Sequence, residues 1–111
     1  MTAFEAIRQA LKETYPEIPA VPYTYDGDKD LYITYNYAHD RGGDFGDNQP
    51  SVNVVSVQVH LWLPKRINFQ SYRTTVRSAL FRQGFTYPDV TVLEEDTMRH
   101  IVFACEYEEQ K

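Results

Sequence analysis

A chain of 111 residues with 42% hydrophobic and 24% charged residues has the size and composition of one globular domain. No apolar run approaches the roughly 18 residues that cross a membrane, and a formal net charge of −5 argues against a broad nucleic-acid-binding surface. The single Cys105 excludes an internal disulfide, so we expect synthesis in a reducing cytosol.

Charge is segregated along the chain. Residues 1–47 hold nine acids and four bases, residues 48–88 hold no acid and five bases, and residues 89–111 hold seven acids and two bases. One interpretation is that folding interleaves these blocks again and leaves no net polarity. The other is an electrostatically two-sided subunit that meets copies of itself or a partner.

The first predicted element is an amphipathic helix that begins after Thr2. Thr2 and Glu5 fit a capping box, in which each side chain accepts a hydrogen bond from the other residue's backbone N–H. Pro16 disfavours the α conformation at Tyr15, so the helix should end there. The apolar stripe consists of Phe4, Ile7 and Leu11, with Ala3, Ala6 and Ala10 beside it.

A β-hairpin is predicted next. Pro16, Pro19 and Pro22 favour an extended connection into it. The strands would be residues 21–25 and 31–37, joined by the Asp-Gly-containing turn at residues 26–30. Residues 31–37 alternate in the period of a strand, and both of their faces are partly aromatic.

Residues 38–51 predict a flexible loop. They hold three of the five glycines, three Asp residues and one Pro, and Phe45 is the only large apolar side chain among them. A compact domain rarely keeps an irregular segment of this length without a functional use. We therefore expect these residues to be mobile in the free subunit.

The central strand is the strongest signal in the chain. Val55, Val57, Val59, Leu61 and Leu63 alternate with Ser56, Gln58, His60 and Trp62, and Pro64 closes the run. Burial of the five apolar side chains contributes roughly 1.5–3 kcal/mol each, as an upper estimate. On the opposite face, Trp62 would either be covered by the first helix or the loop, or anchor an interface.

A second helix and a second hairpin complete the prediction. Asn68 is a suitable N-cap, with Ile67 and Tyr72 as a hydrophobic staple, and Gly84 is a suitable C′ residue. The buried stripe consists of Phe69, Tyr72, Val76, Ala79 and Leu80, while Arg73 and Arg77 share another face. The hairpin would pair residues 90–94 with residues 99–107, and residues 106–111 would form a solvated tail.

This element order predicts an α+β fold. We expect a single domain over residues 1–111, with a mixed or antiparallel sheet of about five strands and two helices packed on one face. Cys105 alternates with Ile101 and Phe103, which favours a packed thiol over a nucleophile.

No catalytic or metal-binding constellation emerges from the spacing. Asp26, Asp28 and Asp30 resemble the start of a calcium loop, but Leu31 and Tyr37 stand where Gly and Glu are required. Ser56 and His60 share a strand face but lie roughly 13 Å apart, too far for a nucleophile and its base. The histidines and loop Asp residues lack metal-ligand spacing. We expect no enzymatic activity, cofactor or metal.

Several stretches together resemble a known family. They are YITYNY, the Asp-rich segment ending in DNQP, VVSVQVHLWLP, ALFRQGF and EEDTMRHIVFACEYEE, which span about residues 32–109. In this order they resemble the tail terminator, or tail-to-head joining, proteins of long-tailed bacteriophages and prophages of Gram-positive bacteria. The likeness lies in element order and loose consensus rather than in a catalytic signature.

The resemblance implies a structural role without cofactor or catalytic residues. Such proteins cap the tail tube as a ring, commonly a hexamer, and present a surface to the head connector, so the protein would reside in the virion. Its partners would be copies of itself, the tail tube protein and the connector protein, with no sequence-specific nucleic-acid or membrane binding.

Two interaction hypotheses follow. On the second helix, Arg73 and Arg77 would meet an acidic segment of a neighbouring subunit, and Trp62 would be a further contact. The loop would become ordered on assembly, with Phe45 as its anchor. Its Asp40, Asp44 and Asp47 would lie near the ring lumen. The alternatives are a neighbouring head-tail connector or head-completion protein and, from another class, a small ligand-binding domain or enzyme.

Overall fold

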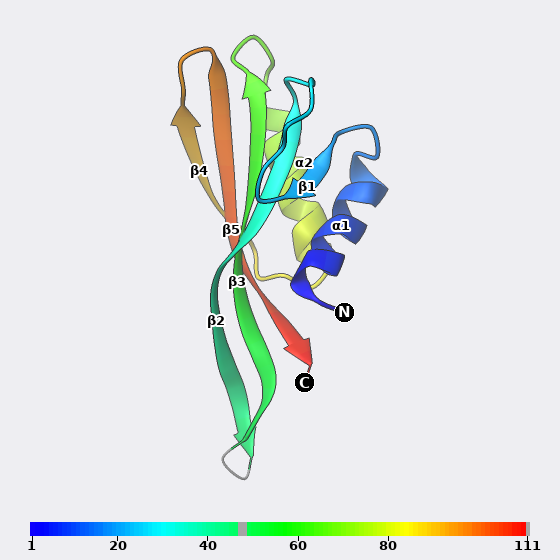
Figure 1. The fold of residues 1–111 in the computed structure, drawn as a ribbon, viewed down its shortest axis with the longest axis vertical. Coiled ribbons are helices and arrows are strands. Elements are labelled where there is room, and N and C mark those ends of the chain that lie inside the picture. Colours follow the sequence, from blue (N-terminus) through cyan, green and yellow to red (C-terminus); the bar gives the residue numbers. More distant parts are fainter. Residues whose placement is uncertain (47–48, 111) are drawn as a thin grey trace.

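The fold is α+β, as the sequence predicts, with one mixed five-stranded sheet whose helices both pack on the same face (Figure 1). The computed structural model describes the backbone of residues 1–46 and 49–110, and the side chains of these residues outside 44–51. Its elements are α1 (Ala3–Thr14), β1 (Ala20–Pro22), β2 (Tyr32–Gly46), β3 (Gln49–Pro64), α2 (Gln70–Arg82), β4 (Asp89–Glu94) and β5 (Met98–Gln110).

β3 lies at the centre of the sheet, whose strand order is β1-β2-β3-β5-β4. It pairs antiparallel with β2 on one side and with β5 on the other. The predicted inward set is confirmed, because all five members are at most 1% exposed: Val55, Val57, Val59, Leu61 and Leu63. The two helices cover this face and close the hydrophobic core over it.

Local signals place both helices. The capping box of α1 is confirmed, since Glu5 N–H donates to Thr2 Oγ1 at 3.2 Å and Thr2 N–H donates to Glu5 Oε1 at 2.7 Å. α2 begins one residue later than predicted, because Phe69 is its N-cap residue and Asn68 accepts from the Gln70 N–H instead. Gly84 follows its end at φ +114°, a backbone conformation that only glycine adopts without strain.

The first predicted hairpin is wrong. β1 pairs with β2 in parallel, with Val21 opposite Thr34, instead of folding back on it. Pro22 ends β1, and Tyr23 adopts φ +63°, which turns the chain out of the sheet. Residues 24–31 then carry the chain back to start β2 in the same direction, with the Lys29 N–H bonded to the Tyr25 hydroxyl at 3.1 Å. The Asp-Gly signal marks a turn, but not a two-strand reversal.

The predicted loop at residues 38–51 is also wrong over its described part. Residues 38–46 continue β2 and residues 49–51 begin β3, with a register shift between Tyr37 and His39. Glycine and Asp are depleted in strands, so composition alone indicated a loop. Strand pairing overrides that preference. A Cβ on Gly43 would lie 3.2 Å from a Val54 methyl group, so the glycine permits close approach there.

The resulting projection of β2 and β3, residues 38–46 with 49–55, is called the arm below, and it is two-stranded beyond Val52. It extends beyond the helices and makes the subunit 54 Å long and 25 Å across (Figure 1). Only the end of β5, residues 107–110, pairs with its base on β3. The predicted solvated tail is therefore wrong too, because residues 106–110 belong to a strand.

Glu109 joins three elements near the arm base. Its Oε2 accepts hydrogen bonds from the Ala3 N–H at 2.6 Å and from the Tyr37 hydroxyl at 3.2 Å. The Ala3 N–H is one of the donors at the start of α1 that have no partner inside the helix. Burial and, to a smaller extent, the Glu109 carboxylate raise the pKa of Tyr37 to about 12.

We therefore predict that Glu109→Ala lowers the free energy of unfolding by about 1–2 kcal/mol, because it leaves a part-buried N–H at the helix start and the Tyr37 hydroxyl without their acceptor. Urea denaturation followed by circular dichroism measures the change. Glu108→Ala, at an exposed neighbouring position, is the matched control and should change stability by less than about 0.5 kcal/mol. Equal effects of the two substitutions would contradict this role for Glu109.

Cys105 is a core residue, as predicted. Its side chain is 6% exposed, and burial raises the pKa of its thiol to about 12. A protonated and covered thiol reacts slowly, because the thiolate is the nucleophile.

We predict that a thiol reagent at pH 8 labels the native protein far more slowly than the urea-unfolded protein, and that Cys105→Ala unfolds at a modestly lower urea concentration. Mass spectrometry of timed samples measures the labelling rate. Equal labelling rates with and without urea would show that the last hairpin does not hold this register.

Candidate functional site

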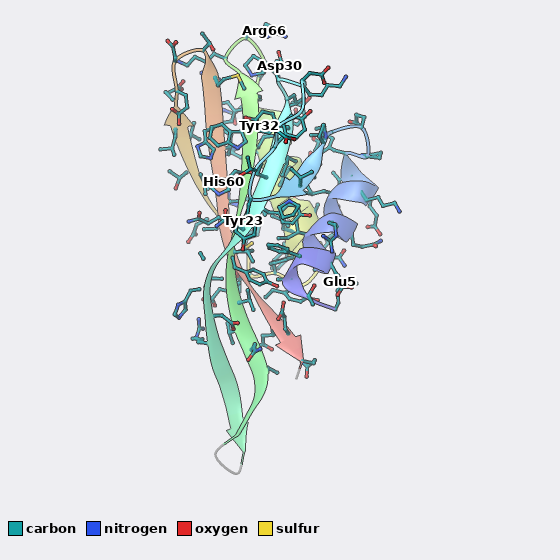
Figure 2. The ribbon with its side chains drawn as sticks, in the orientation of Figure 1. Glu5, Tyr23, Asp30, Tyr32, His60 and Arg66 are labelled. Atoms are coloured by element: carbon teal, nitrogen blue, oxygen red, sulfur yellow. The ribbon has the colours of Figure 1, made fainter. Side chains whose placement is uncertain are left out.

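The sheet face opposite the helices, called the open face below, carries an aligned row of side chains. Strand register places Tyr32 opposite Trp62, Trp62 opposite His100, and His100 opposite Leu93. The row therefore crosses β2, β3, β5 and β4 in order. Figure 2 shows Tyr32 and His60 extending from this part of the sheet.

The rings of the row stack in series. Trp62 lies over His100 at 3.7 Å between ring centroids with 12° between planes, and over Tyr32 at 6.1 Å with 17°. Tyr25, from the segment between β1 and β2, extends the stack by packing on Tyr32 at 4.6 Å. Offset stacking of aromatic pairs stabilises by roughly 0.5–1.5 kcal/mol beyond area burial, so these contacts add to the stability of the sheet.

Trp62 is half-buried within this row. Its indole N–H donates to Thr34 Oγ1 at 3.3 Å, so its polar edge has a partner inside the subunit. Rings of its own sheet flank it, whereas the first helix packs on the opposite face. Trp62 is therefore covered by neighbouring rings of the sheet and not by the first helix, as one expectation had it. Its role at an interface stays a prediction.

Two histidines form a pair beside the row. His60 Nδ1 lies 2.6 Å from His100 Nε2, and His60 Nε2 lies 2.9 Å from Asn36 Oδ1. One ring must donate and the other accept, so the arrangement requires at least one neutral imidazole at the shared contact. Glu95 approaches the remaining nitrogen of His100 at 3.9 Å.

The pair favours the neutral state. Burial lowers the pKa of His60, and the neighbouring His100 lowers it further. Burial also lowers the pKa of His100, while Glu95 acts weakly in the opposite direction. A second proton would place two cations in contact where His100 is only 8% exposed.

A charged cluster joins the arm to β5 on the same face. Glu106 accepts from Arg41 at 2.9 Å and from Ser56 at 3.2 Å. The hydrogen bond from Arg41 is the main cause that lowers the pKa of Glu106. Ser56 donates to Glu106, whereas His60 contacts His100. Ser56 and His60 thus have different partners, as expected from their distance along the strand.

Of the residues nominated from the sequence, those whose side chains the structure describes lie on different parts of the subunit. Asp40 is exposed on the arm, and Asp44 and Phe45 belong to β2, but their side chains lie outside the described part. Asp47 lies outside the described residues altogether. Trp62 belongs to the open face.

The two arginines lie on α2, on the helix-covered side of the sheet. Arg77 donates to the Pro88 carbonyl at 2.8 Å and lies 4.2 Å above the Tyr87 ring, so its guanidinium is occupied inside the subunit. Arg73 is partly buried, and its Nε has no hydrogen-bond partner among the described residues. Both side chains are partly exposed, and their contact with a neighbouring subunit stays a prediction.

The side chains of the open face stack on and hydrogen-bond to one another. Among the described residues, no three or more His, Cys, Asp or Glu side chains are arranged to hold a metal ion. Over the same residues, no helix is long and apolar enough to cross a membrane.

Comparison with known proteins identifies the fold but not a family. No family model matches the sequence, and no curated protein matches it. Eighteen chains of solved structures match its fold. One of them matches 100% of this chain and 98% of its own length, with a TM-score of 0.58 and 13% identity, and its name states no function. At this identity the likeness shows the fold alone.

Sequence reasoning found Trp62 and His60 but missed their neighbours. Alternation placed both on the polar face of the central strand, yet it could not reveal which residues of other strands lie opposite. His100 and Tyr32 become partners only once β5 and β2 are aligned with β3. An alternating strand face that carries Tyr or His is the local signal for such a row.

The histidine pair makes stability pH-dependent. Because the folded state lowers the pKa of both rings below the ordinary 6.5, the unfolded chain binds protons more readily. We predict that the free energy of unfolding decreases as the pH falls below about 6.5, by at most about 1.4 kcal/mol per pH unit for each extra proton. Urea titrations between pH 7.5 and pH 5 measure this slope.

A His60→Gln/His100→Gln double variant should show a flatter dependence over this window. His39→Gln is the control, because His39 is an exposed histidine on the arm and should leave the slope unchanged. A slope that persists in the double variant would assign the pH dependence to other groups.

Proposed function

We propose that this chain is a structural subunit of a bacteriophage or prophage tail, where it caps the tail tube as a ring and joins it to the head connector. The resemblance of residues 32–109 to tail terminator proteins names this class. The α+β fold that the resemblance implies is the fold of the chain. The proposed role is assembly in the virion rather than catalysis, after synthesis in the bacterial host.

The arm is the observation that carries the proposal. The arm projects beyond the helices (Figure 1), and beyond Val52 it is a two-stranded ribbon, which is marginally stable alone in water. β1 pairs with residues 33–35 only, so the outer edge of β2 beyond Tyr37 has no strand partner within the described part of the chain. Exposed strand edges in proteins are usually paired or covered. The open edge of β2 therefore favours a subunit whose arm is covered by neighbouring subunits or by the tail tube.

The charges of the arm fit a position at the channel of such a ring. Residues 38–51 contain three acids, Asp40, Asp44 and Asp47, and one cation, Arg41. Arg41 already forms an ion pair with Glu106. Acidic side chains at a lumen repel DNA phosphates and let the DNA pass without holding it. The arm would thus contact the tube while leaving the channel open.

We predict that a shortened arm leaves the subunit folded but unable to cap tubes. Gly42 and Asn53 are directly paired, so replacing residues 43–52 with Asn-Gly closes the hairpin by a favoured two-residue turn. Negative-stain electron microscopy of purified tail tubes mixed with the variant measures end binding. Wild-type protein should bind tube ends, and the variant should bind them at least tenfold more weakly.

A full-length arm with Asp44→Asn/Asp47→Asn removes the same two carboxylates as the shortening, so it separates the effect of arm length from that of charge, and it should retain end binding. Thermal melts establish that each variant is folded. Binding of wild-type protein to head connectors but not to tube ends would favour a head-completion protein instead. Unchanged tube binding by the shortened variant would remove the arm from the proposal.

A further inference from the structure

A groove lies between the second half of α1 and the connection into β1. It encloses about 230 Å³, and its lining includes Leu11, Tyr15, Ile18 and Ala20. Small-molecule sites usually measure about 300–1,000 Å³, so this groove is better matched to one or two aliphatic side chains of a protein partner.

The charged residues that line this groove are both cations. Lys12 is exposed and makes no ion pair within the described residues. Arg8 is also exposed, and its guanidinium lies 3.5 Å from the Tyr35 hydroxyl. An apolar groove with a cationic rim selects a segment that presents an apolar side chain beside carboxylates.

The opposite edge of the same subunit offers such a segment. On the edge strand β4, Val92 is 41% and Leu93 is 42% exposed. The turn after β4 carries Glu95 and Asp96, both exposed. The nearby cations are occupied elsewhere, since Lys65 and Arg99 both pair with Glu94. The end of β4 is thus apolar and acidic.

We infer that the β4 end of one copy docks in the α1 groove of a second copy, a contact that rests on the proposed ring function. β4 and β1 are the two edges of the sheet, and α1 lies on the β1 side (Figure 1). Two different, complementary surfaces on one subunit make a head-to-tail contact, which generates a ring when the rotation between copies closes.

Side chains rather than backbone mediate the contact. β1 is three residues long, Pro22 ends it, and Pro19 precedes it, so this sheet edge cannot be extended by a further strand. Leu93 or Val92 fills the groove, while Glu95 and Asp96 face Arg8 and Lys12. The contact is salt-sensitive and individually weak, and ring closure raises its effective strength.

A charge-swap mixture tests the contact. In Arg8→Glu/Lys12→Glu the acidic β4 end meets an acidic groove, and in Glu95→Lys/Asp96→Lys a basic end meets a basic groove. Each variant alone should self-associate at least tenfold more weakly than wild-type protein in sedimentation velocity at low salt. A 1:1 mixture of the two should recover association to within about threefold of wild type, because every contact in an alternating ring is then complementary.

Asp26→Lys/Asp28→Lys carries the same charge change as the second variant at exposed positions of the β1–β2 segment, and it should associate like wild type. Single swaps, Lys12→Glu and Asp96→Lys, replace any double variant that thermal melts show to be unfolded. A mixture without recovery, or wild-type protein that stays monomeric at all concentrations, would overturn the inference.

The same variants separate this contact from the proposed function. If the mixture recovers association but wild-type protein never binds tube ends, the contact between copies stands and the tail role fails. If wild-type protein caps tubes while both variants and their mixture associate normally, the ring is built through other surfaces. Loss of tube binding in the groove variant without recovery in the mixture would assign the groove to an acidic segment of another protein.

Discussion

Everything in this domain depends on the pairing of β3 along both of its edges. The strand provides the apolar floor on which α1 and α2 pack, and each inward residue is almost completely covered. Because side chains alternate along a strand, the register that buries Val59 and Leu61 also sets His60 and Trp62 on the opposite face. Core packing and the open-face row are therefore consequences of one alignment.

A bulge in β2 changes the alignment of β2 with β3 where the arm begins. Tyr37 is opposite Val57 and His39 is opposite Ser56, so the register shifts between them. Bulges raise local twist and redirect a strand. Here the redirected segment is fastened by carboxylates of β5, with Glu106 bonding Arg41 on the open face and Glu109 bonding Tyr37 near the start of α1.

Features set by neighbouring residues were predictable from the sequence. The capping box at Thr2, the alternation from Val55 to Leu63 and the glycine after α2 each arise from interactions within a few residues. The parallel placement of β1, the strand character of residues 38–46 and the contact of His60 with His100 depend on partners chosen elsewhere in the chain. Local composition favoured a loop at the arm, but pairing with the valine-rich start of β3 outweighs it.

The position of β5 has a consequence for biosynthesis. Because the last strand lies between β3 and β4, the emerging chain can form the β2–β3 ribbon and the helices before the sheet can be completed. Ile101 and Phe103, which fill the core opposite Leu61 and Val59, are synthesised after β1 to β4 and both helices. Long-range strand pairing of this kind slows folding. Until β5 has emerged, the nascent chain therefore leaves one edge of β3 unpaired and part of the core unfilled, and chaperones have a binding site that the folded subunit lacks.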